Sequence, residues 1–330
     1  MYESKYHKED LSNYVFLITG GAGFIGSNIV EYLLKNDAKE VRVFDNLATG
    51  FKKNIAPFLG LDNFKFIEGD ITDYQQCLEA TKGVDYISHQ AALGSVPRSI
   101  KKPLGTNLAN VNGFINMATA ARENKIKRMV YASSSSVYGD SPELPKVENR
   151  IGKPLSPYAV TKYVNELYAD VFHKNYKQEI IGLRYFNVFG PNQSPQGEYA
   201  AVIPLFIDAL RNNKSPMING DGTQSRDFTF VENAVQANIR ALFTKEEDAL
   251  GEVFNVAYGE KYDLLQLVSF LQDIIGSDTP AKHREERQGD IKKSWADISK
   301  ARKLLGYDPL FQFKDGLKIT VDWFLNKEQD

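Results

Sequence analysis

A glycine-rich segment at residues 19–26, with the sequence TGGAGFIG, constrains the fold of this chain more than any other feature. It follows the apolar run Val15-Phe16-Leu17-Ile18 and opens a helical pattern that extends to Lys35. In that setting Gly20 allows a tight turn, Gly23 lets the backbone approach a pyrophosphate, and Gly26 permits close packing of helix on strand. The segment therefore predicts the first strand, turn and helix of a dinucleotide-binding unit, with phosphates attracted to the helix start.

Strand-length apolar runs alternate with helical patterns through the first half of the chain. This rhythm predicts an α/β fold with a doubly wound parallel (Rossmann) sheet. The alternation breaks down after Gly190-Pro191-Asn192, so we expect a Rossmann domain at residues 1–188 that carries the catalytic residues. Residues 189–330 should form a smaller mixed α/β substrate-binding domain, with some segments returning to the first. The expected strands are Val15–Thr19, Val41–Phe44, Phe64–Ile67, Tyr86–Ser88, Met129–Ala132 and Ile180–Leu183, and the expected helices Ile25–Lys35, Leu104–Asn124 and Tyr158–Tyr176.

Asp45 ends the second expected strand, 19 residues after Gly26. A carboxylate there can accept hydrogen bonds from both ribose hydroxyls and would repel a 2′-phosphate, which favours NAD over NADP. The alternative interpretation of Asp45 is a surface turn. Asp70, in Gly69-Asp70-Ile71 after the third strand, could meet the adenine edge or cap a following helix.

Tyr158 and Lys162 stand four residues apart, so a helix would place both side chains on one face. A cation near a phenol favours the phenolate, and a lowered pKa would suit Tyr158 as a general base. The spacing alone is weak, since with 17 tyrosines it should occur more than once by chance. The glycine turn upstream and the serine run Ser133-Ser134-Ser135-Ser136 supply the context.

Composition excludes several classes of function. The formal net charge of −2 leaves no footprint for nucleic acid. A single cysteine, Cys77, rules out internal disulfides, and four scattered histidines offer no metal-ligand spacing. Residues 1–13 lack the apolar region of a secretion signal, and no apolar run reaches 18 residues. We expect a cytoplasmic protein with no membrane or nucleic-acid partner and no metal.

Seven motifs resemble the extended short-chain dehydrogenase/reductases that act on nucleotide sugars, and within them the UDP-hexose 4-epimerases. They are TGGAGFIG at 19–26, FDNL at 44–47, EGDI at 68–71, SSSSVYGD at 133–140, SPYAVTK at 156–162, LRYFNVFGP at 183–191 and RQGD at 287–290. The resemblance runs nearly end to end. The subgroup that the chain most resembles interconverts UDP-N-acetylglucosamine and UDP-N-acetylgalactosamine for bacterial surface polysaccharides, such as lipopolysaccharide.

The resemblance implies roles for individual residues. Ser134 would hydrogen-bond the sugar 4-hydroxyl and pass its proton to Tyr158, with Lys162 as the third catalytic residue; the alternative for the serine run is a flexible or capping segment. NAD contacts are implied for Gly20, Gly23, Phe24, Ile25, Gly26, Asp45, Asn46, Leu47, Thr49, Gly50, Asp70, Ile71, Gln90, Ala91, Ala92, Tyr158, Lys162 and Phe186, the last beside the nicotinamide. UDP-sugar contacts are implied for Gly94, Ser95, Ser134, Ser135, Ser136, Tyr158, Asn187, Gln193, Ala201, Val202, Arg226, Arg287, Asp290 and Ser294.

The implied reaction is an oxidation undone on the opposite face of the sugar. The C4 hydride goes to bound NAD, the 4-keto sugar turns, and the hydride returns, so no net redox change results. Related dehydratases and decarboxylases carry a carboxylate where this chain has Ser135 and Ser136, which favours epimerisation. UDP-glucuronate 4-epimerases carry a similar serine run and remain the alternative; a catalytically silent NAD or nucleotide-sugar binder is a third, and a net oxidoreductase a fourth.

Ser294 bears on the choice of sugar. In the family that the chain resembles, members confined to plain hexoses carry a tyrosine at this position, whereas those accepting N-acetyl sugars carry a cysteine or serine. A small residue leaves room for an acetamide, and Gly94 and Ser95 favour the same subgroup; plain UDP-glucose and UDP-galactose could also be accepted. The alternative for Ser294 is an ordinary exposed serine. We further expect a homodimer, for which the helices at 104–124 and 158–176 are candidates; the alternative is that their apolar faces are buried within one chain.

Overall fold

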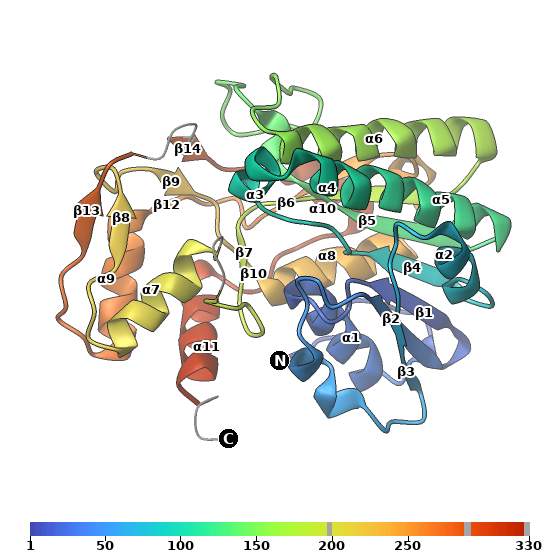
Figure 1. The fold of residues 1–330 in the computed structure, drawn as a ribbon, viewed down its shortest axis with the longest axis horizontal. Helices are drawn as coiled ribbons and strands as arrows, with labels where there is room; N and C mark the ends of the chain where they lie inside the picture. The colour runs from blue at the N-terminus through green and yellow to red at the C-terminus, as the bar shows by residue number, and fades with distance from the viewer. Residues whose placement is uncertain (197–199, 287–291, 327–330) are drawn as a thin grey trace.

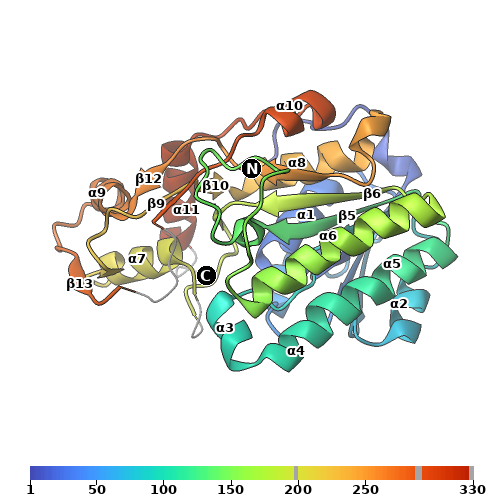
Figure 2. The same ribbon diagram turned by 90° about the horizontal axis from the view of Figure 1, so that it is seen from above.

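A parallel seven-stranded sheet forms the centre of the protein, in a computed structural model that describes residues 1–196, 200–286 and 292–326. Its strands run in the order β11-β6-β5-β4-β1-β2-β3, and each neighbouring pair is parallel (Figures 1 and 2). The order reverses at β1, as in a doubly wound fold, and the predicted fold class is confirmed. The strands are β1 (Val15–Thr19), β2 (Glu40–Asp45), β3 (Phe64–Glu68), β4 (Tyr86–His89), β5 (Arg128–Ser134), β6 (Ile180–Tyr185) and β11 (Val253–Val256).

Helices cover both faces of this sheet (Figure 1). One apolar cluster lies under α1 (Phe24–Lys35), α8 (Val231–Phe243) and α10 (Ser299–Leu305). The other lies under α2 (Tyr74–Ala80), α5 (Gly113–Glu123) and α6 (Pro157–Tyr176). The helix expected at 104–124 is divided into α4 (Pro103–Asn107), a π-helical turn (Leu108–Asn112) and α5.

Two elements of the sheet layer come from the second half of the chain. Strand β11 pairs with β6 from Val253↔Gly182 to Val256↔Tyr185, and α8 packs beside α1. Asn255 joins them to the first half, since its Nδ2 donates to the Lys146 carbonyl and its Oδ1 accepts from the Tyr138 hydroxyl at 2.7 Å. Segments beyond residue 189 thus complete the central sheet.

The rest of the second half forms a smaller lobe of short strands and helices beside the sheet (Figure 2). Its core is built from aromatic side chains, among them Phe189, Phe228, Phe230 and Phe313. The strands are β7 (Val188–Phe189), β8 (Met217–Asn219), β9 (Ser225–Arg226), β10 (Thr229–Phe230), β12 (Tyr262–Asp263), β13 (Lys282–Arg284) and β14 (Lys293–Ser294). The helices are α7 (Val202–Arg211), α9 (Leu264–Ile275) and α11 (Phe313–Asn326).

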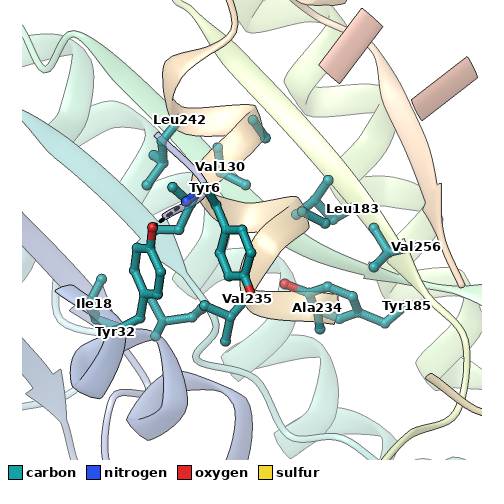
Figure 3. Packing of buried hydrophobic residues seen from close by; sticks show 14 of the residues in the cluster. Tyr6, Ile18, Tyr32, Val130, Leu183, Tyr185, Ala234, Val235, Leu242 and Val256 are labelled. Carbon is teal, nitrogen blue, oxygen red and sulfur yellow. Dashed lines mark hydrogen bonds between the residues drawn. The ribbon is translucent and has the colours of Figure 1, made fainter. Parts of the chain in front are cut away.

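An amino-terminal arm packs across α1 and α8. Tyr6 stacks on Tyr32 with ring centroids 5.2 Å apart, and the Tyr6 N–H donates to the Tyr32 hydroxyl at 2.7 Å (Figure 3). The hydroxyl of Tyr6 donates to Glu232 at 2.8 Å. These contacts bury aromatic rings in a segment whose sequence reads as charged. Short helical turns occur at Leu11–Asn13, Lys52–Asn54, Ala56–Phe58, Ser135–Tyr138 and Glu247–Ala249, and α3 spans Val96–Lys101. None of the helices described is long and apolar enough to cross a membrane.

Candidate active site

A cavity of about 820 Å³ opens at the carboxyl ends of the parallel strands. This edge, next to the point where strand order reverses, is where open α/β sheets bind ligands. Its size suits a ligand larger than a simple metabolite. Most residues predicted to bind NAD or substrate line it: Gly20, Gly23, Phe24, Ile25, Gly26, Asp45, Asn46, Thr49, Gly50, Asp70, Ile71, Gln90, Ala91, Ala92, Gly94, Ser134, Tyr158, Lys162, Asn187, Gln193 and Ala201.

The glycine turn fits a pyrophosphate. Gly20 has a φ of +68°, and a Cβ on it would lie 2.7 Å from the Ala91 nitrogen. A Cβ on Gly26 would collide with the Gly20 carbonyl. Helix α1 starts after Gly23, which makes no side-chain cap, so phosphate oxygens can meet the first N–H groups directly. These glycines are required by close backbone contacts.

Asp45 stands at the end of β2 with its carboxylate on the cavity. It accepts from the Ala22 N–H at 3.0 Å and the Leu47 N–H at 2.8 Å, which aims the carboxylate beside the glycine turn. Burial raises its pKa, and these two hydrogen bonds oppose that shift. Asp45 is therefore a buried residue that also closes a local turn through the Leu47 N–H, and its position suits a ribose.

Asp70 also lies on the cavity, where its Oδ2 accepts from Asn46 at 2.9 Å. The helix cap in this segment is Asp73, whose side chain accepts from the N–H groups of Gln75 and Gln76 at the start of α2. Of the two interpretations of Asp70, the cavity contact is the one that its place favours.

Tyr158 and Lys162 occupy the first turns of α6, and Ser134 ends β5 opposite them. Ser156 caps this helix by accepting from the Ala159 N–H at 3.2 Å. The Lys162 Nζ donates to the Ala132 carbonyl at 2.7 Å and lies 6.0 Å from the centroid of the Tyr158 ring. Ser134 of β5 thus shares one wall of the cavity with Tyr158 and Lys162 of α6.

The expectation that the pKa of Tyr158 is lowered is wrong. Burial raises the pKa of Tyr158, and a hydrogen bond with Ser134 opposes the shift. Burial also lowers the pKa of Lys162 to about 8, against the attraction of Glu166. Desolvation penalises both charged forms here, the phenolate of Tyr158 and the ammonium of Lys162.

The four serines of the run have different contacts. The Ser134 Oγ accepts from the Ser136 hydroxyl at 3.0 Å and from the Ser136 N–H at 3.2 Å, so it caps the turn Ser135–Tyr138. The Ser133 hydroxyl instead donates to the Glu166 carboxylate at 2.5 Å. Ser133 and Ser134 line the cavity, whereas Ser135 and Ser136 are not among its lining residues.

Tyr185 is a cavity residue that the sequence did not single out, although it lies in the LRYFNVFGP motif. Its hydroxyl donates to the Gln90 Oε1 at 3.0 Å and accepts from the Asn238 Nδ2 at 2.7 Å. The carboxyl end of a parallel strand was the signal that could have found it. Arg98 of α3 also lines the cavity, and no comparable signal marks it.

Several predicted contacts lie outside the cavity lining: Leu47, Ser95, Ser135, Ser136, Phe186, Val202, Arg226 and Ser294. Phe186 is wholly buried and packs on Tyr138, with centroids 5.9 Å apart, because Tyr185 and Asn187 on either side face the cavity instead. Ser95 caps α3 by accepting from the Arg98 N–H. Their contacts with ligand remain predictions.

Arg226 and Ser294 are neighbours in the second lobe, paired across β9 and β14. Ser294 is only 8% exposed, so the alternative of an ordinary exposed serine is wrong. Next to them, the buried Asp227 accepts from the N–H groups of Tyr258, Gly259 and Ala296. Burial raises its pKa to about 7. Arg287 and Asp290 lie outside the described residues.

Comparison with known proteins places this geometry among nucleotide-sugar enzymes. Residues 16–257 match the NAD dependent epimerase/dehydratase family. A putative UDP-glucose 4-epimerase of Methanocaldococcus jannaschii is 38% identical over 317 residues, which cover 96% of this chain and 100% of that protein.

Two solved structures resemble the fold closely. A UDP-N-acetylglucosamine 4-epimerase from Methanobrevibacter ruminantium, in complex with UDP-N-acetylmuramic acid, has a TM-score of 0.90 and 40% identity, covering 95% of this chain and 99% of that one. A UDP-glucuronic acid 4-epimerase from Bacillus cereus, in complex with UDP-glucuronic acid and NAD, has a TM-score of 0.88 and 33% identity, with 95% and 99% coverage.

Proposed function

Since this chain belongs to the NAD-dependent epimerase/dehydratase family and is an NAD-dependent UDP-sugar 4-epimerase, we propose that it acts on N-acetylated UDP-hexoses. The proposed reaction interconverts UDP-N-acetylglucosamine and UDP-N-acetylgalactosamine. UDP-glucose and UDP-galactose are proposed as secondary substrates.

The proposed division of labour follows from the places of the three catalytic candidates. Bound NAD supplies the hydride acceptor and donor. Tyr158 takes the proton of the C4 hydroxyl as the general base, and Ser134 orients that hydroxyl from the end of β5. We propose that Lys162, whose Nζ lies 6.0 Å from the centroid of the Tyr158 ring, favours the phenolate. We propose the same roles in reverse when the hydride returns to the other face of the 4-keto sugar.

The observation that carries the substrate proposal is the open wall at Gly94. A Cβ built on Gly94 would meet no atom within 4 Å, so the cavity has unfilled space at this point. Ala200 and Ala201 line the cavity with equally small side chains from the other lobe. Space of this kind suits a substituent larger than hydroxyl, such as an acetamide.

The proposal is tested with the purified protein and no added cofactor. UDP-N-acetylglucosamine, UDP-glucose and UDP-glucuronate are supplied in parallel, and both epimers of each are separated by chromatography. We expect the acetylated substrate to have the highest kcat/KM. Turnover of UDP-glucuronate alone would overturn the substrate assignment, and binding without turnover would favour a silent member.

We also propose that the protein is a homodimer joined through α4 and α6. These helices contact each other, and their outer side chains are unusually apolar for a surface. Leu104 is 85% exposed on α4, while Val160, Leu167 and Val171 are exposed at helical spacing on α6. Sedimentation should show a dimer that Leu167→Lys converts to monomer. Leu310→Lys, at an exposed apolar residue of the other lobe, should leave it a dimer.

A further inference from the structure

We propose that Glu166 is a positioning residue for the reaction: it fixes the end of β5 against α6 and keeps the Lys162 ammonium charged beside Tyr158. The inference rests on the proposed catalytic roles of Ser134, Tyr158 and Lys162. Glu166 stands one helical turn beyond Lys162 and is not among the residues that line the cavity. It acts on the reaction only through its neighbours.

The Glu166 carboxylate joins three elements. Its Oε1 accepts from the Ser133 hydroxyl at 2.5 Å, so it holds the residue that precedes Ser134 at the end of β5. The Arg184 guanidinium of β6 donates to Oε1 at 2.8 Å and to Oε2 at 2.7 Å, a bidentate pair. Arg184 also donates to the Glu148 carbonyl at 2.9 Å. These bonds tie α6, β5 and β6 together directly behind the catalytic wall.

Burial makes this pair unlike the surface ion pairs of the same helix. The side chains of Arg184 and Glu166 are 3% and 7% exposed, whereas those of Lys174 and Asp170 are 68% and 45% exposed. A buried pair costs much of its attraction in lost hydration, so stability alone is a weak reason to place one here. The pair does hold α6 against β5 and β6, and it places the Glu166 charge one helical turn from Lys162; these two effects account for a buried pair at this position.

The charges facing Lys162 explain its dependence on Glu166. The Ala132 carbonyl of β5 accepts a hydrogen bond from the Lys162 ammonium. His89 of β4 is neutral, because burial and the charge of Lys162 lower its pKa to about 3. Burial lowers the pKa of Lys162 to about 8, and Glu166 raises it. Tyr158 is the remaining titratable neighbour; burial favours its neutral phenol, which must lose its proton before it can act as the base. Glu166 is therefore the anion that favours the charged lysine.

The test is Glu166→Gln, which keeps the shape and removes the charge. We expect its alkaline limb of kcat to move down by about one pH unit, a typical effect of one nearby charge. At pH 8 that shift alone lowers kcat about fivefold. KM should stay within about twofold, because Glu166 lies off the cavity. Asp170→Asn, the same change one turn further along α6, should leave the pH profile unchanged.

A second variant covers loss of folding. Glu166→Gln leaves Arg184 as an unpaired buried cation, so Glu166→Gln/Arg184→Gln removes both charges together. We expect this folded protein to shift its alkaline limb in the same direction, by less. A folded single or double variant with the wild-type pH profile and kcat would overturn the proposal.

A readout without substrate separates this inference from the proposed function. NMR of isotope-labelled lysine, with Lys162→Met to assign the signal, gives the titration midpoint of Lys162 directly. We expect a lower midpoint in Glu166→Gln than in wild type, and an equal midpoint would sink the inference even if epimerase activity is found. Absence of epimerase activity in wild type would instead remove the proposed function.

Discussion

The cofactor half and the smaller lobe reach the cavity in different ways. In the first half, the glycine turn, Asp45 and Asp70 follow consecutive parallel strands, and all of them line one cavity. In the smaller lobe, Arg226 and Ser294 sit on two-residue strands away from the cavity lining, while Gln193 and Ala201 reach it from loops. Residues that follow neighbouring parallel strands lie at the same edge of the sheet, whereas the position of each loop depends on its own packing.

The difference shows that cofactor recognition and sugar recognition depend on different parts of the structure. Cofactor recognition depends on backbone geometry within one strand-turn-helix unit, so a local motif is enough to predict it. Recognition of the sugar depends on the placement of several loops relative to the sheet. Residues that a motif predicts as substrate contacts can then lie outside the cavity lining, as Arg226 and Ser294 do.

Tyr158→Phe should have the largest effect, because it removes the proposed base from the point where the two regions meet. We expect kcat to fall about 10³-fold, within the range for a lost general base. Bound NAD, measured by its absorbance after denaturation, should remain near one per chain. Turnover close to wild type would refute the role of Tyr158.

Gly26→Ala tests the cofactor half. The new methyl would collide with the Gly20 carbonyl, so the turn must open and the phosphate site with it. We expect affinity for NAD to fall about 100-fold, the loss of a few kcal/mol of contacts. Gly105→Ala places a methyl at another glycine of the cavity lining, where a Cβ meets nothing within 4 Å, and so compares a methyl without a clash. Equal NAD content in both variants would contradict the expectation.

The pH dependence of stability tests the role of the buried Asp227 in the smaller lobe. Its folded pKa, about 7, lies above the ordinary value near 4, so the folded state holds the proton longer than the unfolded state does. The free energy of unfolding should therefore fall as pH rises from about 4 to 7, by at most about 1.4 kcal/mol per pH unit.

Asp227→Asn removes this titration, so urea unfolding across that range should show a flatter pH dependence than in wild type. At pH 5 the folded wild type still holds this proton, so the amide replaces a neutral group of the same shape and the two stabilities should lie close together. Parallel stability curves for the two proteins would show that Asp227 does not titrate in this range.

Ser294→Tyr should have the smallest effect, and it is the sharpest test of the smaller lobe. We expect kcat/KM for the acetylated substrate to fall about fivefold more than for UDP-glucose, since one steric contact is at stake. Because Ser294 is buried, unfolding has to be measured alongside, and Ser294→Ala serves as a small-residue control. Equal loss on both substrates would remove Ser294 as a gate.

The strand predictions are confirmed because the buried strands are rich in apolar residues, either in continuous runs or, in β2 and β3, alternating with Arg42 and Lys65. All six predicted strands occur, each as long as predicted or longer by one to three residues. The seventh strand, β11, has the same composition, but it is short and lies far along the chain, and only its pairing with β6 identifies it. The buried arm at Tyr2 and Tyr6 was missed because its apolar residues are spaced among charged ones.

The sequence by itself determined the nucleotide-binding half, the preference for NAD and the three catalytic candidates, because each depends on residues close together or on a helix repeat. Only the tertiary structure decided that burial governs the ionisation of Tyr158 and Lys162, that Glu166 and Arg184 hold the wall behind them, and which predicted contacts face the cavity. Desolvation and charge depend on every element packed around a group, and those elements come from distant parts of the chain.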